Sequence, residues 1–405
     1  MYIYAEYMHT LKPWNSFPGG ILHFLLFKEK LMKFTFDRDS MVKEVSIAQE
    51  IISTKNASSI LSNILIDAQD NRLIIKATDI KINYETQLPV QVLEEGSTTV
   101  YCDKFLGILN SLPSGEIEFI QDVNENDELS VKVKISTLDR KNKFEMRCMS
   151  NDKFPEVYTA ENVPYFEVSS KELKDMISQT YFATSDDETR YFMNGVFFEK
   201  KEDNMNLVAT DGRRLSFSSK KILAGISDFS PAIVHPKILN IILKHAPEEG
   251  NIFVAIIDRM IFFKFGNYKF GSVLIEGTFP NYERVIPENQ AHCFQVEKSD
   301  LLGALKSVSQ MVDRKAGRVF FNISDGILKI SAQQTDFGSA DAEIPCIYAG
   351  EPYSIAMNFG YVEEPLRSID SDRIAFEFTE EMKAVTMRPE PAADYFHIIM
   401  PMQSD

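Results

Sequence analysis

One arrangement of strands and turns occurs three times along the chain, and it constrains the fold more than any other feature. The three copies are apolar hairpins at residues 64–75, 196–208 and 319–330. Ala-Thr-Asp follows the first two hairpins, ending at Asp79 and Asp211, whereas Ala-Gln-Gln follows the third. We interpret this as a single structural unit that is repeated three times along the chain. The unit is far longer than solenoid repeats, whose periods run from roughly 20 to 50 residues, so each copy is predicted to form a domain of its own.

Each copy opens with a short alternating strand, at residues 34–36, 166–168 and 294–296. A helix is predicted after each strand, because apolar residues recur with a spacing of four, which places them on one face. These pairs are Met41 and Val45, Leu173 and Ile177, and Leu301 and Leu305. Polar residues at each helix start, 37–40, 169–170 and 299–300, are expected to accept hydrogen bonds from the first-turn amides.

A second helix is predicted after each hairpin, at residues 104–112, 236–245 and 359–369. Pro365 lies inside the third of these helices and should kink or break it. Further alternating strands close each unit, with Gly266-Asn267 as one of the hairpin turns. Two helices with many antiparallel strands per unit predict the α+β class.

The repeat divides the chain into an extension and three domains. We predict an N-terminal extension outside the fold at residues 1–31, then domains at residues 32–157, 158–289 and 290–405. The extension has an apolar run at residues 21–27, which is too short to span a bilayer. It has neither a basic leader nor a small-residue cleavage site, so Met32 is expected to be the natural start.

The net charge and the cysteine spacing indicate a soluble protein with reduced thiols. The chain has 43 basic and 59 acidic residues, a net charge of −16, which favours solubility and argues against general adhesion to nucleic acid. A local basic surface remains compatible with this total. The four cysteines form no C-x-x-C pair, so we expect buried, reduced thiols in a cytoplasmic protein. They are Cys102, Cys148, Cys293 and Cys346.

The sequence has no phosphate-binding loop, no dinucleotide fingerprint, no zinc-protease motif and no nucleophile elbow. Asp79 and Asp211 could be imagined as a catalytic carboxylate pair, as in a hydrolase. They occupy equivalent positions in separate domains, however, so we expect each to fix a turn after a strand. The sequence therefore argues against an enzyme, and it predicts neither a cofactor nor a metal site. A structural or adhesion protein built of repeats would be expected to carry a secretory signal, which we do not find.

Two features indicate binding. The chain ends in apolar, flexible side chains at residues 395–402, which either adapt to partners or form a buried strand with a frayed end. Lysines recur on the predicted helices, but acidic residues are interspersed, a pattern that is also typical of a solvated face. The lysines in question are Lys43, Lys104, Lys171, Lys174, Lys237, Lys244 and Lys306, with Arg314 and Lys315 just beyond.

Together these motifs resemble one family, the bacterial sliding clamps (DNA polymerase III subunit beta). The resemblance rests on the triplicated domain, on Met32-Lys33-Phe34-Thr35, on residues 209–215 (Ala-Thr-Asp-Gly-Arg-Arg-Leu), on residues 279–285 (Phe-Pro-Asn-Tyr-Glu-Arg-Val) and on Met400-Pro401-Met402. It implies three clamp domains that form half of a ring, closed as a head-to-tail homodimer around duplex DNA. Helices would line the hole. The ring would tether the replicative polymerase and confer processivity after a loader opens it, and it would need no cofactor.

The resemblance also implies sites. Short linear peptides from the polymerase, the loader and repair proteins would bind an apolar slot with an arginine rim between domains two and three. Its residues would be Met193, Thr210, Gly212, Arg213, Arg214, Leu215, Pro280, Arg284, Val285, Ile398, Met400, Pro401 and Met402. Sequence-independent DNA contacts are expected from Lys55, Lys104, Arg190 and Tyr191, and the dimer interface from Phe144 and Met311. Arg213 stands where the family usually has histidine, and the ending Gln403-Ser404-Asp405 is more acidic than the family's, so peptide preference could shift.

Overall fold

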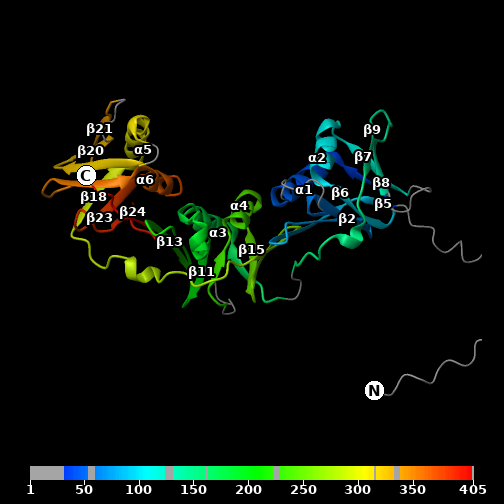
Figure 1. Cartoon of the computed structure of the whole chain (residues 1–405), viewed down its shortest axis with the longest axis horizontal. Helices are drawn as coiled ribbons and strands as arrows, with labels where there is room; N and C mark the ends of the chain where they lie inside the picture. The colour runs from blue at the N-terminus through cyan, green and yellow to red at the C-terminus, as the bar shows by residue number, and fades with distance from the viewer. Residues whose placement is uncertain are drawn as a thin grey trace, which may run out of the picture.

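A computed structural model describes residues 32–52, 60–123, 131–159, 163–221, 229–313, 316–332 and 338–403. Three lobes follow one another along an arc (Figure 1), and the labelled helices lie on the concave side of this arc. The strands form the layer behind the helices. The arrangement matches the predicted α+β class, with helices packed on antiparallel sheets.

The first lobe contains two helices and antiparallel strands, and its hairpin turns at Asp70 and Asn71, which both have positive φ. Its helices are α1 (Arg38–Ile51) and α2 (Cys102–Ser111), with the 3₁₀ turns η1 (Ile60–Ser62) and η2 (Asn151–Lys153). Its strands are β1 (Lys33–Asp37), β2 (Asn63–Gln69), β3 (Arg72–Thr78), β4 (Ile82–Pro89), β5 (Gln91–Glu94), β6 (Gly96–Tyr101), β7 (Glu116–Val123), β8 (Val131–Thr137) and β9 (Lys143–Arg147).

The second lobe repeats this plan. Its helices are α3 (Ser170–Ser178) and α4 (Pro236–His245), with the 3₁₀ turns η3 (Tyr181–Ala183), η4 (Glu188–Met193) and η5 (Tyr282–Val285). Its strands are β10 (Phe166–Ser169), β11 (Val196–Lys201), β12 (Asn204–Thr210), β13 (Arg214–Lys221), β14 (Ala232–Val234), β15 (Asn251–Ile257), β16 (Met260–Phe265) and β17 (Tyr268–Val273).

The third lobe closes the chain. Its helices are α5 (Lys298–Val308) and α6 (Phe359–Leu366), with the 3₁₀ turn η6 (Ser309–Met311). Its strands are β18 (His292–Glu297), β19 (Arg318–Ser324), β20 (Ile327–Ala332), β21 (Asp341–Pro345), β22 (Tyr353–Asn358), β23 (Arg373–Phe378), β24 (Val385–Glu390) and β25 (Tyr395–Ile399). Helix α6 contains Pro365, which has no N–H to donate to the carbonyl of Tyr361, and it ends at Leu366, earlier than the predicted end at Ile369.

The repeat extends to how each first helix begins. In each lobe, the first helical N–H donates to a carbonyl of a distant loop: Arg38 to Gly115, Ser170 to Gly250 and Lys298 to Asp372, at 2.9, 2.8 and 2.7 Å. Side-chain caps are predicted for all three helices. Asp37 and Ser169 cap α1 and α3, but α5 begins at Lys298 after Glu297 with no side-chain cap, so the third prediction is wrong. Helix α5 keeps only the bond to the loop carbonyl of Asp372 that all three helices share in kind.

The predicted helix stripes are buried. All six apolar residues of the three pairs are 0% exposed, so each first helix packs one face onto its sheets. Of the four free cysteines, Cys102 and Cys346 are buried and Cys148 is half-buried. Cys293 is exposed, so the prediction of a buried thiol is wrong at that position: it lies on β18, at the edge of its sheet.

Two eight-stranded sheets cross the boundaries between lobes. One has the order β10-β15-β16-β17-β4-β3-β2-β6, and β4 of the first lobe pairs with β17 of the second. The other has the order β14-β11-β12-β13-β25-β24-β23-β18, and β13 of the second lobe pairs with β25 of the third. At the ends of the arc lie a five-stranded sheet, with β9 at one edge, and a four-stranded sheet, with β21 at one edge. Within the described ranges, no helix is long and apolar enough to cross a membrane.

Candidate functional site

The loop between β12 and β13 is closed by one carboxylate. Asp211 Oδ1 accepts hydrogen bonds from the backbone N–H groups of Arg213 and Arg214, at 2.8 and 3.0 Å. In the first lobe, Asp79 Oδ1 accepts from Lys81 and Ile82 in the same way, at 3.1 and 2.7 Å. The prediction that these aspartates fix turns is therefore confirmed. Gly212 has φ +86°, a conformation that suits glycine.

An apolar cluster lies where β13 meets β25, and we call it the junction cluster. In the register of the two strands, Leu215 is opposite Ile398. Two aromatic pairs stack in this region: the Phe197 and Phe279 rings lie 4.7 Å apart, and the Phe217 and Phe396 rings lie 4.9 Å apart. The buried members of the junction cluster are Val208, Leu215, Ile233, Phe279, Tyr282, Phe396 and Ile398. The second and third lobes thus share one small core here.

Residues next to the junction cluster reach the surface, and we call them the junction surface. Val285, at the end of η5, is 50% exposed, and Met400, which follows β25, is 43% exposed. The N–H of Met400 donates to the carbonyl of Arg213 at 2.9 Å, which joins the chain end to the β12–β13 loop. The N–H of Met402 donates to Ala356 at 2.8 Å, so the chain end is held on both sides. The junction surface comprises Gly212, Arg213, Pro280, Arg284, Val285, Met400, Pro401 and Met402.

The structure therefore brings together most of the residues predicted for peptide binding. Leu215 and Ile398 belong to the junction cluster. Met193 and Thr210 are buried, at 5% and 8% exposure, and Thr210 lies opposite Leu215 in the β-ladder. Arg214 differs from all of these.

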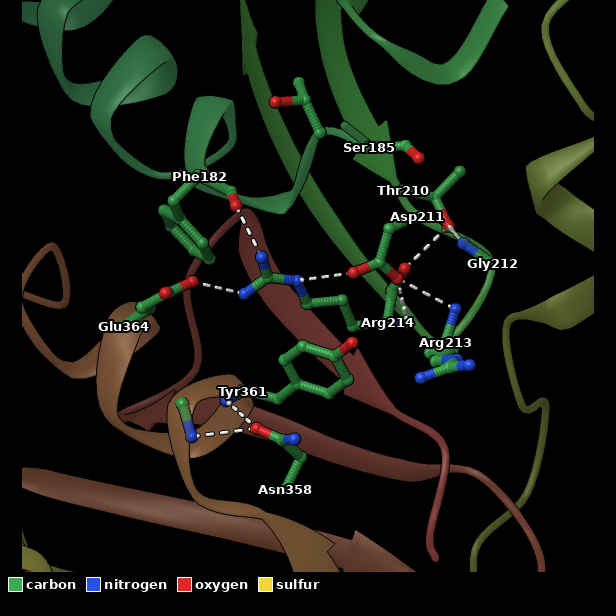
Figure 2. A network of polar contacts seen from close by, with 12 residues as sticks. Phe182, Ser185, Thr210, Asp211, Gly212, Arg213, Arg214, Asn358, Tyr361 and Glu364 are labelled. Atoms are coloured by element: carbon green, nitrogen blue, oxygen red, sulfur yellow. Dashed lines mark hydrogen bonds and ion pairs between the residues drawn. The ribbon is translucent and has the colours of Figure 1, made fainter. Parts of the chain in front are cut away.

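The guanidinium of Arg214 is buried and binds three acceptors (Figure 2). Its Nε donates to Asp211 Oδ2 at 3.1 Å, its Nη2 donates to the carbonyl of Phe182 at 2.7 Å, and its Nη1 pairs with Glu364 of α6. The Tyr361 ring centroid lies 4.5 Å from the Arg214 Cζ. Arg214 is only 8% exposed, so it does not form the arginine rim that the sequence suggested. Arg213 is exposed, and its side chain points away from this network.

A buried histidine lies beside the same network. His397 of β25 is 0% exposed, and its Nδ1 is 3.0 Å from Ser216 Oγ. Because Ser216 Oγ donates to the carbonyl of Gln179 at 2.7 Å, it is left to accept from the histidine. Burial, together with the positive charge of Arg214, lowers the pKa of His397 to about 3. The imidazole is therefore neutral at physiological pH.

The junction between the first and second lobes has the same strand pairing but different residues. At the second junction, β13 and β25 place apolar residues opposite each other: Leu215 opposite Ile398 and Phe217 opposite Phe396. At the equivalent positions of the first junction, β4 and β17 place Asn83 opposite Gly271 and Glu85 opposite Lys269. Glu85 is 6% exposed, and its carboxylate pairs with Lys269 at 2.8 Å and Lys76 at 3.2 Å. Burial alone would raise the pKa of Glu85, but these two lysines lower it below its usual value. On this face of the sheet, the described residues place an ion-paired carboxylate where the second junction has the junction cluster.

The residues predicted to contact DNA fall in different places. Lys104 is exposed on α2, on the concave side of the arc, and Lys55 lies outside the described residues. Arg190 lies on η4, where its Nε pairs with Asp187 at 2.9 Å. A side chain at Gly212 would meet Arg190 Nη1 at 3.0 Å, and one at Gly277 would meet Tyr191 at 3.5 Å. Arg190 therefore borders the junction surface.

The two residues predicted at the dimer interface lie at opposite ends of the arc. Phe144 is half-buried on β9 and lines a shallow hollow with Lys104 and Ile108 of α2. Met311 is 36% exposed on η6, directly after α5 in the third lobe. A head-to-tail contact between two chains would bring such ends together. No group of three potential metal ligands occurs in the part of the chain that the structure describes.

Comparisons with known proteins agree with this architecture. Three domains of the DNA polymerase III beta subunit match the chain: the N-terminal domain at residues 32–158, the central domain at 167–281 and the C-terminal domain at 283–403. The beta sliding clamp of Treponema pallidum is 42% identical over 378 residues, which cover 92% of this chain and 100% of that protein.

Solved structures share the fold. The sliding clamp of Bartonella birtlesii bound to griselimycin has a TM-score of 0.85 and 28% identity, and the match covers 92% of this chain and 100% of that one. The sliding clamp of Bacillus subtilis has a TM-score of 0.86 at 22% identity, with the same coverage.

An arc of three alike domains with helices on its concave side defines a DNA sliding clamp. The chain belongs to the DNA polymerase III beta subunit family, the beta sliding clamps. Members of this family act as dimeric rings around DNA and bind the polymerase and other proteins through peptide motifs.

Proposed function

We propose that two copies of this chain close head to tail into a ring that encircles duplex DNA and tethers the replicative polymerase. The observation that carries this proposal is the arc itself, with helices on its concave side and edge strands at both ends. Each chain supplies half of the ring through domains at residues 32–157, 158–289 and 290–405. The predicted extension at residues 1–31 lies outside the described residues. The clamp has no catalytic role and needs no cofactor, and it works in the cytoplasm.

The ring closes where β9 of one chain meets β21 of the other. Both strands lie at sheet edges, where unpaired backbone groups are available for strand addition. Their net charges are complementary, because β9 exposes Lys143, Glu145 and Arg147, a net charge of +1, whereas β21 exposes Asp341 and Glu343. Phe144 and Met311 flank the two edges and supply apolar contact area. Opposite charges favour the head-to-tail orientation over like ends meeting.

DNA passes through the ring without sequence readout. Helix α2, which carries the exposed Lys104, lies on the concave side of the arc. We propose Lys104, Lys55, Arg190 and Tyr191 as DNA contacts. Arg190 also borders the junction surface. Phosphate contacts are independent of sequence and weakened by salt. The net charge of −16 makes tight general adhesion to DNA unfavourable. Retention therefore depends on enclosure, which lets the ring slide.

Partner peptides bind at the junction surface. An extended peptide can place apolar side chains against Val285, Met400 and the adjacent junction cluster, with Arg213 and Arg284 available at the rim. The site draws on two domains, and the ion pairs around Glu85 exclude an equivalent site at the first junction. One chain thus carries one such site.

The ring mechanism can be tested by retention on DNA. Native mass measurement should give twice the chain mass. Clamps loaded onto closed circular DNA should remain bound in high salt and dissociate once the circle is cut. Equal loss from circular and linear DNA would refute enclosure.

The partner site can be tested with griselimycin, the compound bound to the Bartonella birtlesii and Pseudomonas aeruginosa clamps. Replacing Met400→Ala together with Met402→Ala should weaken its binding, while the dimer mass is unchanged. Unaltered affinity would show that the chain end takes no part in the site.

A further inference from the structure

The Arg214 side chain joins three segments of the chain near the junction surface. Asp211 belongs to the β12–β13 loop, Phe182 belongs to η3, and Glu364 belongs to α6 of the third domain. Arginine presents a planar fork of five donors, so one side chain can bind all three acceptors at once. Figure 2 shows the guanidinium between these partners, with the Tyr361 ring against it.

The network is connected to the junction surface through Asp211. One oxygen of Asp211 binds Arg214, and the other holds the backbone N–H groups of Arg213 and Arg214. The loop that this carboxylate closes presents the carbonyl of Arg213 to the N–H of Met400. Two parts of the third domain are therefore held against the same turn of the second domain. Helix α6 is held by the ion pair between Glu364 and Arg214, and the chain end is held by the bond from Met400 to Arg213.

The aspartate turn at the first junction is also held by an ion pair, but there the cation comes from the neighbouring domain. There Asp79 Oδ1 closes the turn, and Asp79 Oδ2 pairs with Lys237 of α4 at 2.7 Å. Lys237 also donates to the carbonyl of Ile51 at 2.7 Å. In both junctions an ion pair between adjacent domains holds the aspartate turn.

We propose that Arg214 is a positioning residue: it does not touch the partner peptide, but its bridge from Asp211 to Glu364 fixes the β12–β13 loop and the chain end in the relative positions that the peptide requires. The proposal rests on the proposed peptide site at the junction surface. It predicts that Glu364, which lies outside the junction surface, affects peptide affinity through Arg214.

The experiment measures griselimycin affinity of the full dimer at 25 °C, for the natural chain and for Glu364→Gln, Arg214→Gln and the double variant. Glu364→Gln should weaken binding by about tenfold, a typical size for coupling carried by a shared network. The double variant should bind no more weakly than Arg214→Gln alone, because both changes break the same bridge. Lys237→Gln is the matched control: it removes the equivalent ion pair of the first junction and should lower Tm while leaving affinity unchanged.

Two results would overturn the proposal. If Glu364→Gln binds like the natural chain while Arg214→Gln does not, Arg214 contacts the ligand directly. If Lys237→Gln weakens binding as much as Glu364→Gln, the effect is general destabilisation.

Amide hydrogen exchange tests the inference independently of ligand. The Met400 N–H should lose protection in Glu364→Gln and keep it in Lys237→Gln, and equal protection in both variants would refute the bridge. Should the natural chain fail to bind griselimycin, the proposed peptide site is wrong, whereas this exchange result still decides the role of Arg214 in positioning the chain end.

Discussion

Acidification should weaken the junction between the second and third domains through His397. This residue is completely buried, and its Nδ1 lies 3.0 Å from Ser216 Oγ. An imidazolium at this position would lose its hydration and would lie close to the positive charge of Arg214. Both effects favour the neutral ring.

The magnitude follows from the difference in pKa between the folded and unfolded chains. The pKa of His397 is about 3 in the fold, against an ordinary value of 6.5. Because the folded pKa is the lower one, the unfolded chain takes up a proton that the folded chain refuses. The stabilising effect is complete above pH 6.5 and is lost as the pH falls towards 3. The slope is about 1.4 kcal/mol per pH unit, so moving from pH 7 to pH 5 should cost about 2 kcal/mol.

The assay compares urea unfolding of the natural chain with that of His397→Phe at pH 7, 6 and 5. Phenylalanine is suited to the position because the first junction has one at the equivalent place. There Phe270 of β17 is opposite Tyr84 of β4, just as His397 of β25 is opposite Ser216 of β13. His397→Leu serves as a second variant should the larger ring not fit. The stability gap between the natural chain and either variant should shift by about 2 kcal/mol in favour of the variant at pH 5. Parallel pH curves would refute the argument that His397 stays neutral in the fold.

Three further outcomes are expected. Ile80, a β-branched residue with φ +76° and 66% exposure, stands at the position equivalent to Gly212. Because asparagine tolerates this conformation better, Ile80→Asn should raise the free energy of unfolding in urea by about 1 kcal/mol. A loss of stability would contradict the idea that Ile80 is strained. Val285→Ala should weaken griselimycin binding about fivefold at unchanged Tm, and unchanged affinity would place the ligand elsewhere. Asp341→Lys with Glu343→Lys should convert the dimer to monomer by native mass, and charge reversal on β9 should restore it. A stable dimer in the unreversed variant would exclude the β9–β21 contact.

Local elements could be predicted from the sequence because their signals are local. The pair Leu301 and Leu305 marks a buried helix face through spacing alone, and both are buried. Asp211 was predicted to fix a turn because an aspartate after a strand commonly accepts from amides two or three residues on, and it does. Helix α4 begins and ends at the predicted residues, helped by Pro236 at its first position.

Long-range relations were not encoded in any local pattern. Nothing near Leu215 indicates that its strand pairs with β25, close to the end of the chain, so the eight-stranded sheets could not be foreseen. The family resemblance implied an arginine rim for the peptide slot, with Arg214 among its residues. The burial of Arg214 depends on Phe182 and Glu364, which are distant in sequence, and no motif points to Glu364. The family resemblance supplied the list of site residues but not which side of β13 each side chain occupies.

The two sheets that cross the lobe boundaries also determine where the ring can part. Separating lobes within one chain would require breaking main-chain ladders between β4 and β17 or between β13 and β25, together with the shared apolar cores behind them. A contact between chains through β9 and β21 has one short ladder at most. The proposed contact between chains is therefore the least costly place for a loader to open the ring, and each chain can stay in one piece while the ring opens.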